Sequence, residues 1–289
     1  MTKLFSIGIV LSALILSISS CKKNTADDLP KNDINIANGT AGAYLTNGKG
    51  QTLYMFANDA DGISSCTGAC ESLWIPFTVD LTTAKLDANL QATDFATITR
   101  ANGNKQVTYK GWPLYSYSPS TSDSYGNTSN VAEAAGSTKG DGFSGLWFMA
   151  KPDYTVMLAN KQLTGLDGNN YKSDYTIGTG TTTYFTDASG FTLYTFSADS
   201  LSNNKFTKVD LTNYAAFPFF QPDHITVPSI LDKTLFASFT FAGKTQVTYK
   251  GWPLYFSAQD AIRGSNKAVS VGVPGKWQVA VKNITDAPR

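Results

Sequence analysis

The sequence predicts an all-β protein built from two tandem, pseudo-symmetric β domains with short antiparallel strands. The main observation is an internal repeat: residues 106–115 and 246–255 both read QVTYKGWPLY, at an offset of 140 residues. Similarity at a fixed offset indicates a duplicated structural unit. The second observation is composition, because the helix former Glu occurs only twice whereas the turn former Asp occurs twenty times. How the sheets close stays open.

Strands are expected where short β-rich runs alternate with turn residues. Residues 44–54 and 184–194 match at the same offset, and each contains a turn signal between two such runs. Residues 95–100 and 236–241 alternate apolar and polar side chains, as half-buried strands do. Lys110-Gly111 separates two further runs and predicts a hairpin turn. Residues 146–150 and 154–158 add two strands, and weaker similarity within each copy gives four related sub-repeats.

The N-terminus predicts an export signal rather than part of the fold. Residues 1–20 combine Lys3, an apolar run and small residues before Cys21, which describes a secretory signal peptide. The sequence ISSC that ends at Cys21 resembles the lipobox of bacterial lipoproteins, in which the cysteine is lipidated and becomes the first mature residue. A transmembrane anchor is the alternative, but the run of about fifteen residues is shorter than the roughly 20 needed to span a bilayer.

The rest of the chain is expected to form a tether and two domains. Residues 21–40 are rich in Lys, Asn and Asp and predict a flexible tether. The first β domain is expected over residues 41–165, a linker over 166–182, and the second β domain over 183–289. Residues 118–142, rich in Ser, Gly and Asn, predict a solvent-exposed loop in the first copy.

Charge and location follow from the same residues. The formal net charge is +1 and charged residues make up 16% of the chain, so there is no electrostatic footprint for nucleic acid. We expect a protein of the cell envelope, anchored to a membrane through a lipid on Cys21. Lys22 and Lys23 follow the cysteine where Asp would indicate inner-membrane retention, which favours the outer membrane, on its periplasmic or surface face.

A six-residue box recurs in both copies. Tyr54, Phe56 and Asp59 fit the pattern Tyr-x-(Phe/Trp/Tyr)-x-x-Asp, and the second copy repeats it with Tyr194, Phe196 and Asp199. Related boxes begin within the KGWPLY segments, and their candidate residues are Trp112, Tyr115, Trp252, Tyr255 and Asp260. Two boxes depart from the pattern, since Ser120 stands where Asp is expected in the first copy and Ser257 precedes the retained Asp in the second.

Together these boxes resemble the bacterial lipoprotein family with a conserved YxFWYxxD motif, which is also described as a secreted repeat of unknown function. The resemblance covers both copies, over roughly residues 41–282. It implies an extracytoplasmic location and a repeated architecture, and it implies no reaction.

The spacing within the box favours a structural role. Tyr54 and Phe56 are two residues apart and point to the same face of a strand, where they would bury aromatic surface. Asp59 falls just past the strand, where its carboxylate can accept N–H groups of a turn. A ligand platform on the same face is the alternative. Trp112 and Trp252 could likewise stack on a sugar. The alternative is that they pack in the hydrophobic core of each copy.

Cys66 and Cys70 are the two cysteines left once Cys21 is lipidated. Export favours oxidation, so a disulfide that closes a small loop is expected. Copy two has Phe206 and Asp210 at the same offset, which indicates a local staple rather than shared chemistry. The alternative is a redox or copper site, since thiolates suit soft metals. The single histidine, His224, lies in the other copy and is expected at the surface.

These observations predict a non-catalytic binding or scaffolding module rather than an enzyme. The segment 58–62 resembles a calcium loop, but Ala57 and Gly68 stand where ligands are required, so a surface turn is expected. No nucleophile elbow, phosphate loop or His-Glu-x-x-His occurs. We expect no cofactor, a membrane contact through Cys21, and an envelope protein or polysaccharide as partner. The alternative function is an electron-transfer or metal- or haem-handling accessory that uses Cys66, Cys70 and the aromatic boxes.

Overall fold

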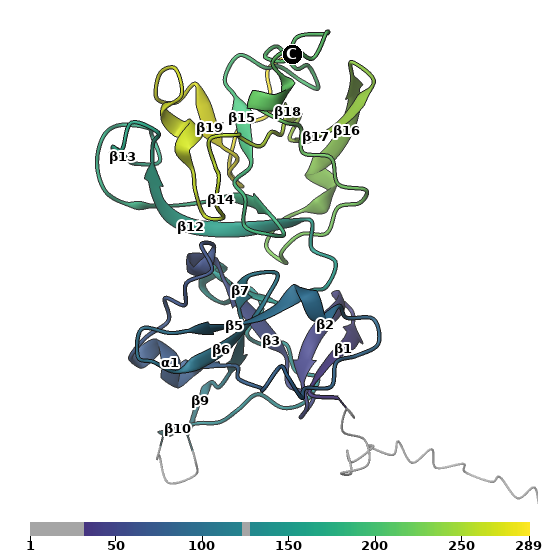
Figure 1. The fold of residues 1–289 in the computed structure, drawn as a ribbon, viewed down its shortest axis with the longest axis vertical. Coiled ribbons are helices and arrows are strands. Elements are labelled where there is room, and N and C mark those ends of the chain that lie inside the picture. Colours follow the sequence, from purple (N-terminus) through teal and green to yellow (C-terminus); the bar gives the residue numbers. More distant parts are fainter. Residues whose placement is uncertain (1–31, 123–127) are drawn as a thin grey trace, which may run out of the picture.

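The computed structural model describes residues 32–122 and 128–289, and it confirms an all-β chain. Figure 1 shows two lobes stacked along the long axis, with copy one below in purple and blue and copy two above in green and yellow. The signal segment 1–20 and Cys21 lie outside the described residues. Within the described residues, no helix has both the length and the apolar character that crossing a membrane requires.

Copy one is built from small antiparallel sheets. Strands β1 and β2 form a hairpin, β11-β3-β8-β4 form a four-stranded sheet, β5-β6-β7 form a second sheet, and β9 pairs with β10. The bounds are β1 (Ile34–Gly39), β2 (Gly42–Asn47), β3 (Leu53–Phe56), β4 (Trp74–Pro76), β5 (Phe95–Thr99), β6 (Lys105–Tyr109), β7 (Trp112–Pro113), β8 (Tyr115–Tyr117), β9 (Ser120–Ser122), β10 (Thr128–Asn130) and β11 (Trp147–Met149).

Copy two repeats this plan with fewer paired strands. Its sheets are β13-β12-β14, β15-β19 and β16-β17-β18. The bounds are β12 (Val156–Thr164), β13 (Asn170–Tyr171), β14 (Thr181–Asp187), β15 (Tyr194–Phe196), β16 (Phe236–Phe241), β17 (Lys244–Tyr249), β18 (Trp252–Pro253) and β19 (Trp277–Val279). The described helices are short: α1 (Ala69–Leu73) and the 3-10 turns η2 (Ala57–Asp59), η3 (Ala92–Asp94), η4 (Phe143–Gly145), η5 (Tyr214–Ala216), η6 (Lys233–Leu235) and η7 (Lys267–Ser270).

Strand pairing shows that the two copies are structurally equivalent. Phe95 pairs with Tyr109 between β5 and β6, and Phe236 pairs with Tyr249 between β16 and β17. The first box strand pairs with the last strand of its copy in both cases, β3 with β11 and β15 with β19. The duplicated sequence therefore folds into duplicated structure, as the 140-residue offset predicted.

The repeated Lys-Gly dipeptide forms the predicted hairpin turn in both copies. Lys110 and Gly111 have φ values of 48° and 78°, and Lys250 and Gly251 have values of 49° and 81°. Positive φ at both central positions defines the type I′ turn, whose twist matches that of the flanking strands. Glycine is required at the second position, because a side chain there would collide with neighbouring atoms in both copies.

Three elements lie outside the predicted domain bounds. Strand β1 falls within the segment 21–40 for which composition predicted a tether, because its apolar residues pair with β2. Strand β12 falls within the predicted first domain, yet it pairs with β14 of copy two over seven residues. Strand β13 falls within the predicted linker 166–182 and pairs with β12. We therefore define copy one as residues 32–155 and copy two as residues 156–289.

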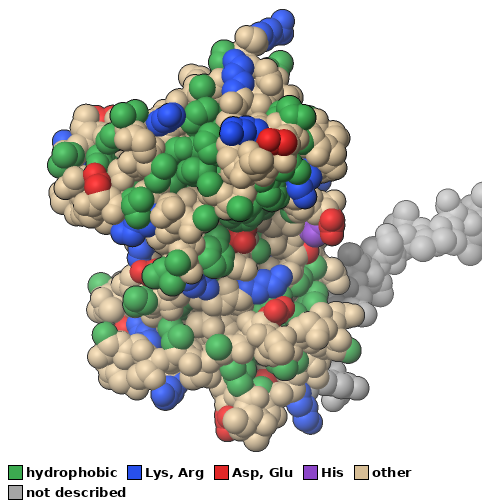
Figure 2. Space-filling model, turned by 45° about the horizontal axis from the view of Figure 1, so that its top comes forward, with side chains coloured by type: hydrophobic (Ala, Val, Ile, Leu, Met, Phe, Trp, Pro, Cys, Tyr) green, Lys and Arg blue, Asp and Glu red, His purple; other side chains and the backbone are tan. Residues whose placement is uncertain are grey.

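The core is aromatic and reaches across both lobes. One cluster of buried side chains extends from Ile34 in copy one to Ala280 in copy two. A second, which we call the aromatic cluster, lies within copy one and contains Tyr44, Tyr54, Phe56, Cys66, Trp74, Tyr115, Tyr117, Trp147 and Met149. Figure 2 shows hydrophobic patches and charges of both signs interspersed on one face of the two lobes.

Candidate functional site

The tyrosines of the boxes in copy one donate hydrogen bonds to buried carboxylates. The Tyr115 hydroxyl donates to Asp59 Oδ2 at 2.6 Å, so the second box reaches the acid of the first. The Tyr54 hydroxyl donates to Glu133 Oε2 at 2.6 Å, so the first box reaches an acid that follows the second. The two pairs cross, and each ties one sub-repeat of copy one to the other.

Copy two contains the same crossed arrangement. The Tyr194 hydroxyl donates to Asp260 Oδ2 at 2.6 Å, and the Tyr255 hydroxyl donates to Asp199 Oδ2 at 2.7 Å. The other carboxylate oxygen accepts a backbone N–H in each case, from Lys267 for Asp260 and from Lys205 for Asp199, both at 2.7 Å. Asp199 thereby orders the turn that follows its strand, as the position of the acid after the box predicted.

The carboxylates of these pairs are buried. Asp59 is 0% exposed and Asp199 is 1% exposed, while Asp260 is 7% exposed. Burial raises the pKa of each of these three carboxyls to about 6, and the hydrogen bonds that they accept oppose the rise. The same burial raises the pKa of the four paired tyrosines far above its ordinary value. The tyrosines therefore act as neutral donors in these pairs.

The box side chains lie in the interior rather than on a platform. Tyr54 is 0% exposed and Phe56 is 8% exposed, and both belong to the aromatic cluster. Leu53 and Met55, on the opposite face of β3, pack into the larger core cluster. Tyr194 and Phe196 are buried in the same way in copy two. A ligand could not reach these rings without unfolding the strand.

Glu133 is the site residue that the motif did not identify. It lies in the segment 118–142 that composition predicted to be exposed, yet it is 5% exposed and accepts hydrogen bonds from Tyr54, Ser137 and Lys139. Ser120, where the motif expects Asp, lies on the exposed strand β9. The sequence offered one signal, since Glu133 is one of only two glutamates in the chain.

A stacked tryptophan accompanies the crossed pairs in each copy. Trp147 lies between Phe56 and Trp74, with ring centroids 4.0 Å and 3.8 Å away and nearly parallel planes. Trp277 stacks on Phe217 at 3.5 Å. The edge of a box tyrosine packs against each of these tryptophans, Tyr115 in copy one and Tyr255 in copy two. The same aromatic core thus supports both copies.

The predicted disulfide is present. Cys66 and Cys70 are bonded, with their Cα atoms 5.3 Å apart, and Cys66 belongs to the aromatic cluster. Phe206 stands at the equivalent position in copy two and packs against the rings of Phe196, Phe217 and Trp277. In copy two, the packing of the Phe206 ring therefore takes the place of the disulfide. In this bonded form the sulfurs are not thiolates, so the alternative metal-handling function lacks its expected ligands.

Trp112 and Trp252 differ in their surroundings. Trp112 is 0% exposed, and its indole N–H donates to the carbonyl of Ala188 in copy two at 2.9 Å. The Arg263 guanidinium of copy two also lies 5.1 Å from the centre of its ring. Trp252 is half-buried and donates to the carbonyl of Thr285 at 2.8 Å. Trp112 is thus a contact between the copies, and stacking on a sugar is excluded at this ring.

The segment that resembles a calcium loop is also a contact between the copies. Asp59 accepts the hydrogen bond from the Tyr115 hydroxyl, and Asp61 accepts a hydrogen bond from Lys161 Nζ at 2.6 Å. Asn58 Oδ1 accepts from Asn160 at 2.8 Å. Across residues 32–122 and 128–289, no three His, Cys, Asp or Glu side chains are grouped as metal ligands would be.

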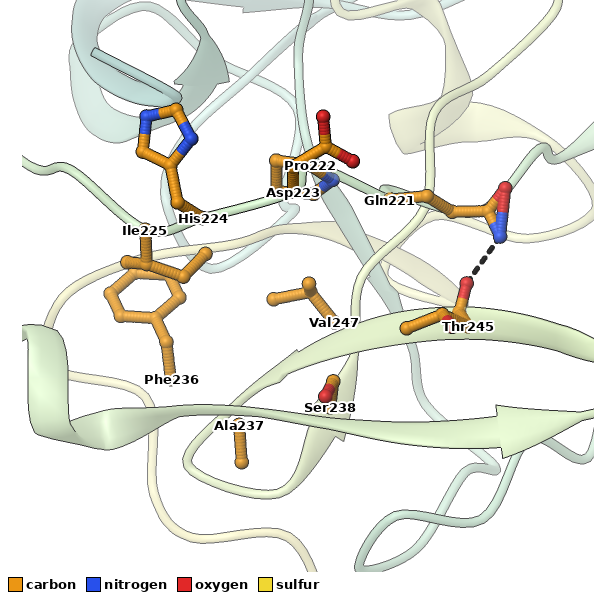
Figure 3. A pocket seen from close by; sticks show the side chains of 10 residues that line it. All are labelled: Gln221, Pro222, Asp223, His224, Ile225, Phe236, Ala237, Ser238, Thr245 and Val247. Atoms are coloured by element: carbon orange, nitrogen blue, oxygen red, sulfur yellow. Dashed lines mark hydrogen bonds between the residues drawn. The ribbon is translucent and has the colours of Figure 1, made fainter. Parts of the chain in front are cut away.

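A groove lies in copy two, between the segment 221–225 and strands β16 and β17. It has a volume of about 610 Å³ and is lined by Gln221, Pro222, Asp223, His224, Ile225, Phe236, Ala237, Ser238, Thr245 and Val247. Figure 3 shows the loop above and the strands below, and Gln221 Nε2 donates to the Thr245 carbonyl. His224 is exposed and contacts the Asp153 carbonyl of copy one at 3.1 Å.

Comparison with known proteins identifies the repeat. A family described as a secreted repeat of unknown function matches residues 35–78 and 96–128. The first match contains the Tyr54 box and the second contains the Tyr115 box, so the two segments correspond to the two sub-repeats of copy one. No curated protein and no solved structure matches the chain. Over these two segments, the first copy is similar to the family of secreted repeats of unknown function.

Proposed function

We propose that this protein is a cell-envelope lipoprotein, anchored through Cys21, whose two copies form a non-catalytic binding or scaffolding module. The observation that carries the proposal is the crossed pairing of the box residues. The tyrosines and carboxylates that recur in the chain are buried against one another, as in the 2.7 Å bond from Tyr255 to Asp199. These side chains therefore stabilise the fold and are not accessible to a ligand. A ligand or partner would have to bind other residues, at the surface.

The anchor is supported by the N-terminal sequence and by the family description. Residues 1–20 have the pattern of a signal peptide, and the sequence ISSC ends at Cys21, the expected first mature residue. The family is described as secreted. Attached acyl chains bind a bilayer by about 0.8 kcal/mol for each buried methylene, so two or three chains give stable attachment. The absence of Asp after Cys21 favours the outer membrane.

The groove at His224 has the size and the lining to hold a ligand. Its volume is within the range of small-molecule sites, and it presents hydrogen-bonding side chains beside an aromatic ring, Phe236. Gln221, Asp223 and Ser238 are exposed along its walls. Such a lining favours a neutral, hydroxyl-rich ligand, and we propose an envelope polysaccharide. A protein partner is the competing outcome of the binding test.

The anchor is tested by cell fractionation. The native chain should incorporate radiolabelled palmitate and sediment with the outer membrane. The Cys21→Ser variant should be unlabelled, and it should leave the outer-membrane fraction. A variant that remains in the outer membrane without label would contradict the lipid anchor.

The groove is tested with a matched pair of variants. Ser238→Arg places a long side chain in the groove, and Thr97→Arg makes the same change at the equivalent exposed position of β5 in copy one. Purified envelope polysaccharides should bind the native chain and Thr97→Arg alike, and bind Ser238→Arg at least about tenfold more weakly. Equal binding by all three would place the site elsewhere, and capture of a protein alone would replace the polysaccharide.

A further inference from the structure

The Lys-Gly turn of copy one, with the tryptophan that follows it, is covered by copy two. We call Lys110, Gly111 and Trp112 the turn face of copy one. The Trp112 indole donates to the Ala188 carbonyl at 2.9 Å, and the Lys110 carbonyl accepts from Arg263 Nη1 at 2.9 Å. Arg263 lies so close to Gly111 that a side chain there would have no room. The turn face of copy one is therefore part of the interface with copy two.

The equivalent turn face of copy two, formed by Lys250, Gly251 and Trp252, is covered by the C-terminal residues instead. The Trp252 indole donates to the Thr285 carbonyl at 2.8 Å. The Lys250 carbonyl accepts from the Ala287 backbone N–H at 2.9 Å. In copy one, the indole N–H of the tryptophan and the carbonyl of the lysine bind copy two. In copy two, the equivalent indole N–H and carbonyl bind residues 285–289 instead.

The two copies follow the same course up to one shared hydrogen bond and differ after it. The Tyr109 hydroxyl donates to the Pro152 carbonyl, and its equivalent Tyr249 donates to the Lys282 carbonyl. Beyond this point, copy one continues into β12, the first strand of the next copy. In copy two the corresponding segment instead folds back over its own turn face, where the Pro288 carbonyl accepts a hydrogen bond from the Leu201 N–H. Figure 1 places the C-terminus at the end of copy two that is remote from copy one.

In copy two, the loop that docks on the turn face of copy one carries Arg263. Copy one has an equivalent loop, but this loop lacks the arginine. Gly264 donates to the Gly190 carbonyl in copy two, and Gly136 donates to the Gly50 carbonyl in copy one, so these loops are equivalent. The residue before each glycine is Arg263 in copy two and the exposed Ala135 in copy one. The outer face of copy one therefore presents the docking loop without its arginine.

We propose that residues 285–289 cap a repeat-docking face, and that this face, once uncovered, accepts the Ala135 loop of a second copy of this chain. The cap and the missing arginine both oppose the docking of a second copy of the chain on these faces. Repeat proteins need such terminal caps, because an uncovered face would join chains head to tail without closure.

The proposal is tested by removing both barriers. The variant that lacks residues 285–289 and carries Ala135→Arg should self-associate in sedimentation velocity, with a concentration-dependent rise in mass beyond a dimer. The controls are Ala135→Arg alone, which should stay monomeric because the cap remains, and the deletion alone. The deletion alone should associate at least about tenfold more weakly than the combined variant, because the charged hydrogen bonds of the arginine are missing.

Two results would overturn the proposal. One is a combined variant that stays monomeric while its circular dichroism matches that of the native chain. The other is equal association with and without Ala135→Arg, which would indicate a symmetric contact between two Trp252 faces. Should the deletion unfold, Ala287→Pro with Ala135→Arg provides the same test, because proline removes the N–H that binds Lys250 and keeps the rest of the chain. Its association is judged by the same two criteria.

Discussion

Glu133 accepts the hydroxyl of Tyr54 at 2.6 Å although it lies 79 residues further along the chain. The pair is buried and joins the two sub-repeats of copy one. It is also the one crossed pair whose acid does not come from the expected motif position, Ser120. The tyrosine–carboxylate geometry is thus kept while the position and the type of acid change.

Removing Glu133 should destabilise copy one strongly. Glu133→Ala removes the carboxylate that accepts from the Tyr54 O–H and from the Lys139 N–H, which we expect to lower the free energy of unfolding by about 2–4 kcal/mol. Urea unfolding followed by tryptophan fluorescence measures the change. Adding Ser120→Asp, which restores the motif, should not rescue the variant because residue 120 is exposed. Rescue by that change would contradict the assignment of Glu133.

Stability should increase as the pH falls from 8 to 5. Burial raises the pKa of Asp59, Asp199 and Asp260 to about 6, above the value of about 4 in an unfolded chain. The folded protein then binds more protons, so this stabilisation is full below about pH 4 and is lost as the pH rises through about 6. We expect each carboxyl to contribute about 1 kcal/mol to the difference between pH 5 and pH 8.

Urea titrations at the two pH values measure this difference. Asp199→Asn should reduce it, because the amide cannot titrate. A native protein that is less stable at pH 5 than at pH 8 would show that these carboxylates are ionised in the folded state.

The disulfide should contribute less than the aromatic residue that replaces it. Cys66→Ser with Cys70→Ser opens a very short loop, and we expect a loss of less than about 3 kcal/mol. Phe206→Ala removes a ring that packs on Phe196, Phe217 and Trp277, and we expect a loss of about 3 kcal/mol. Thermal unfolding of both variants gives the comparison. Complete unfolding of the serine variant would mean that copy one depends on the staple.

Arg263 should hold the two copies together. Its Nε and Nη1 donate to the carbonyls of Ala60 and Lys110 at 2.8 Å and 2.9 Å. Arg263→Ala should increase amide hydrogen exchange in residues 60–62 and 110–112, and should lower the free energy of unfolding by about 2 kcal/mol. Lys172→Ala, a change at an exposed lysine of copy two, is the control. Unchanged exchange at both segments would show that the copies are held by other contacts.

Much of the fold could be predicted because its signals are local. The alternation over residues 236–241 and the Lys110-Gly111 turn each specify their structure from neighbouring residues, and the repeat extends both predictions to the other copy. The pairing of β12 with β14 could not be predicted, because no local pattern states which copy a strand joins. Sheet order likewise depends on contacts between residues far apart in the chain.

The site was predicted in part for the same reason. The two-residue spacing of Tyr54 and Phe56 indicates a shared face, and the structure places both in the aromatic cluster. The partner of Tyr54 could not be found from the motif, because Glu133 lies beyond the box in a segment of loop composition. The role of Arg263 depends on how two copies pack, and its equivalent Ala135 gives no hint of it.

The central claim is that the crossed tyrosine–carboxylate pairs hold each copy together, and a double-mutant cycle on Tyr255 and Asp199 tests it most directly. Tyr255→Phe, Asp199→Asn and the combined variant should give a coupling energy of about 1–3 kcal/mol in urea unfolding at pH 8. Losses that add to within about 0.5 kcal/mol would contradict the claim, because they would show that the 2.7 Å bond between these residues does not stabilise the fold.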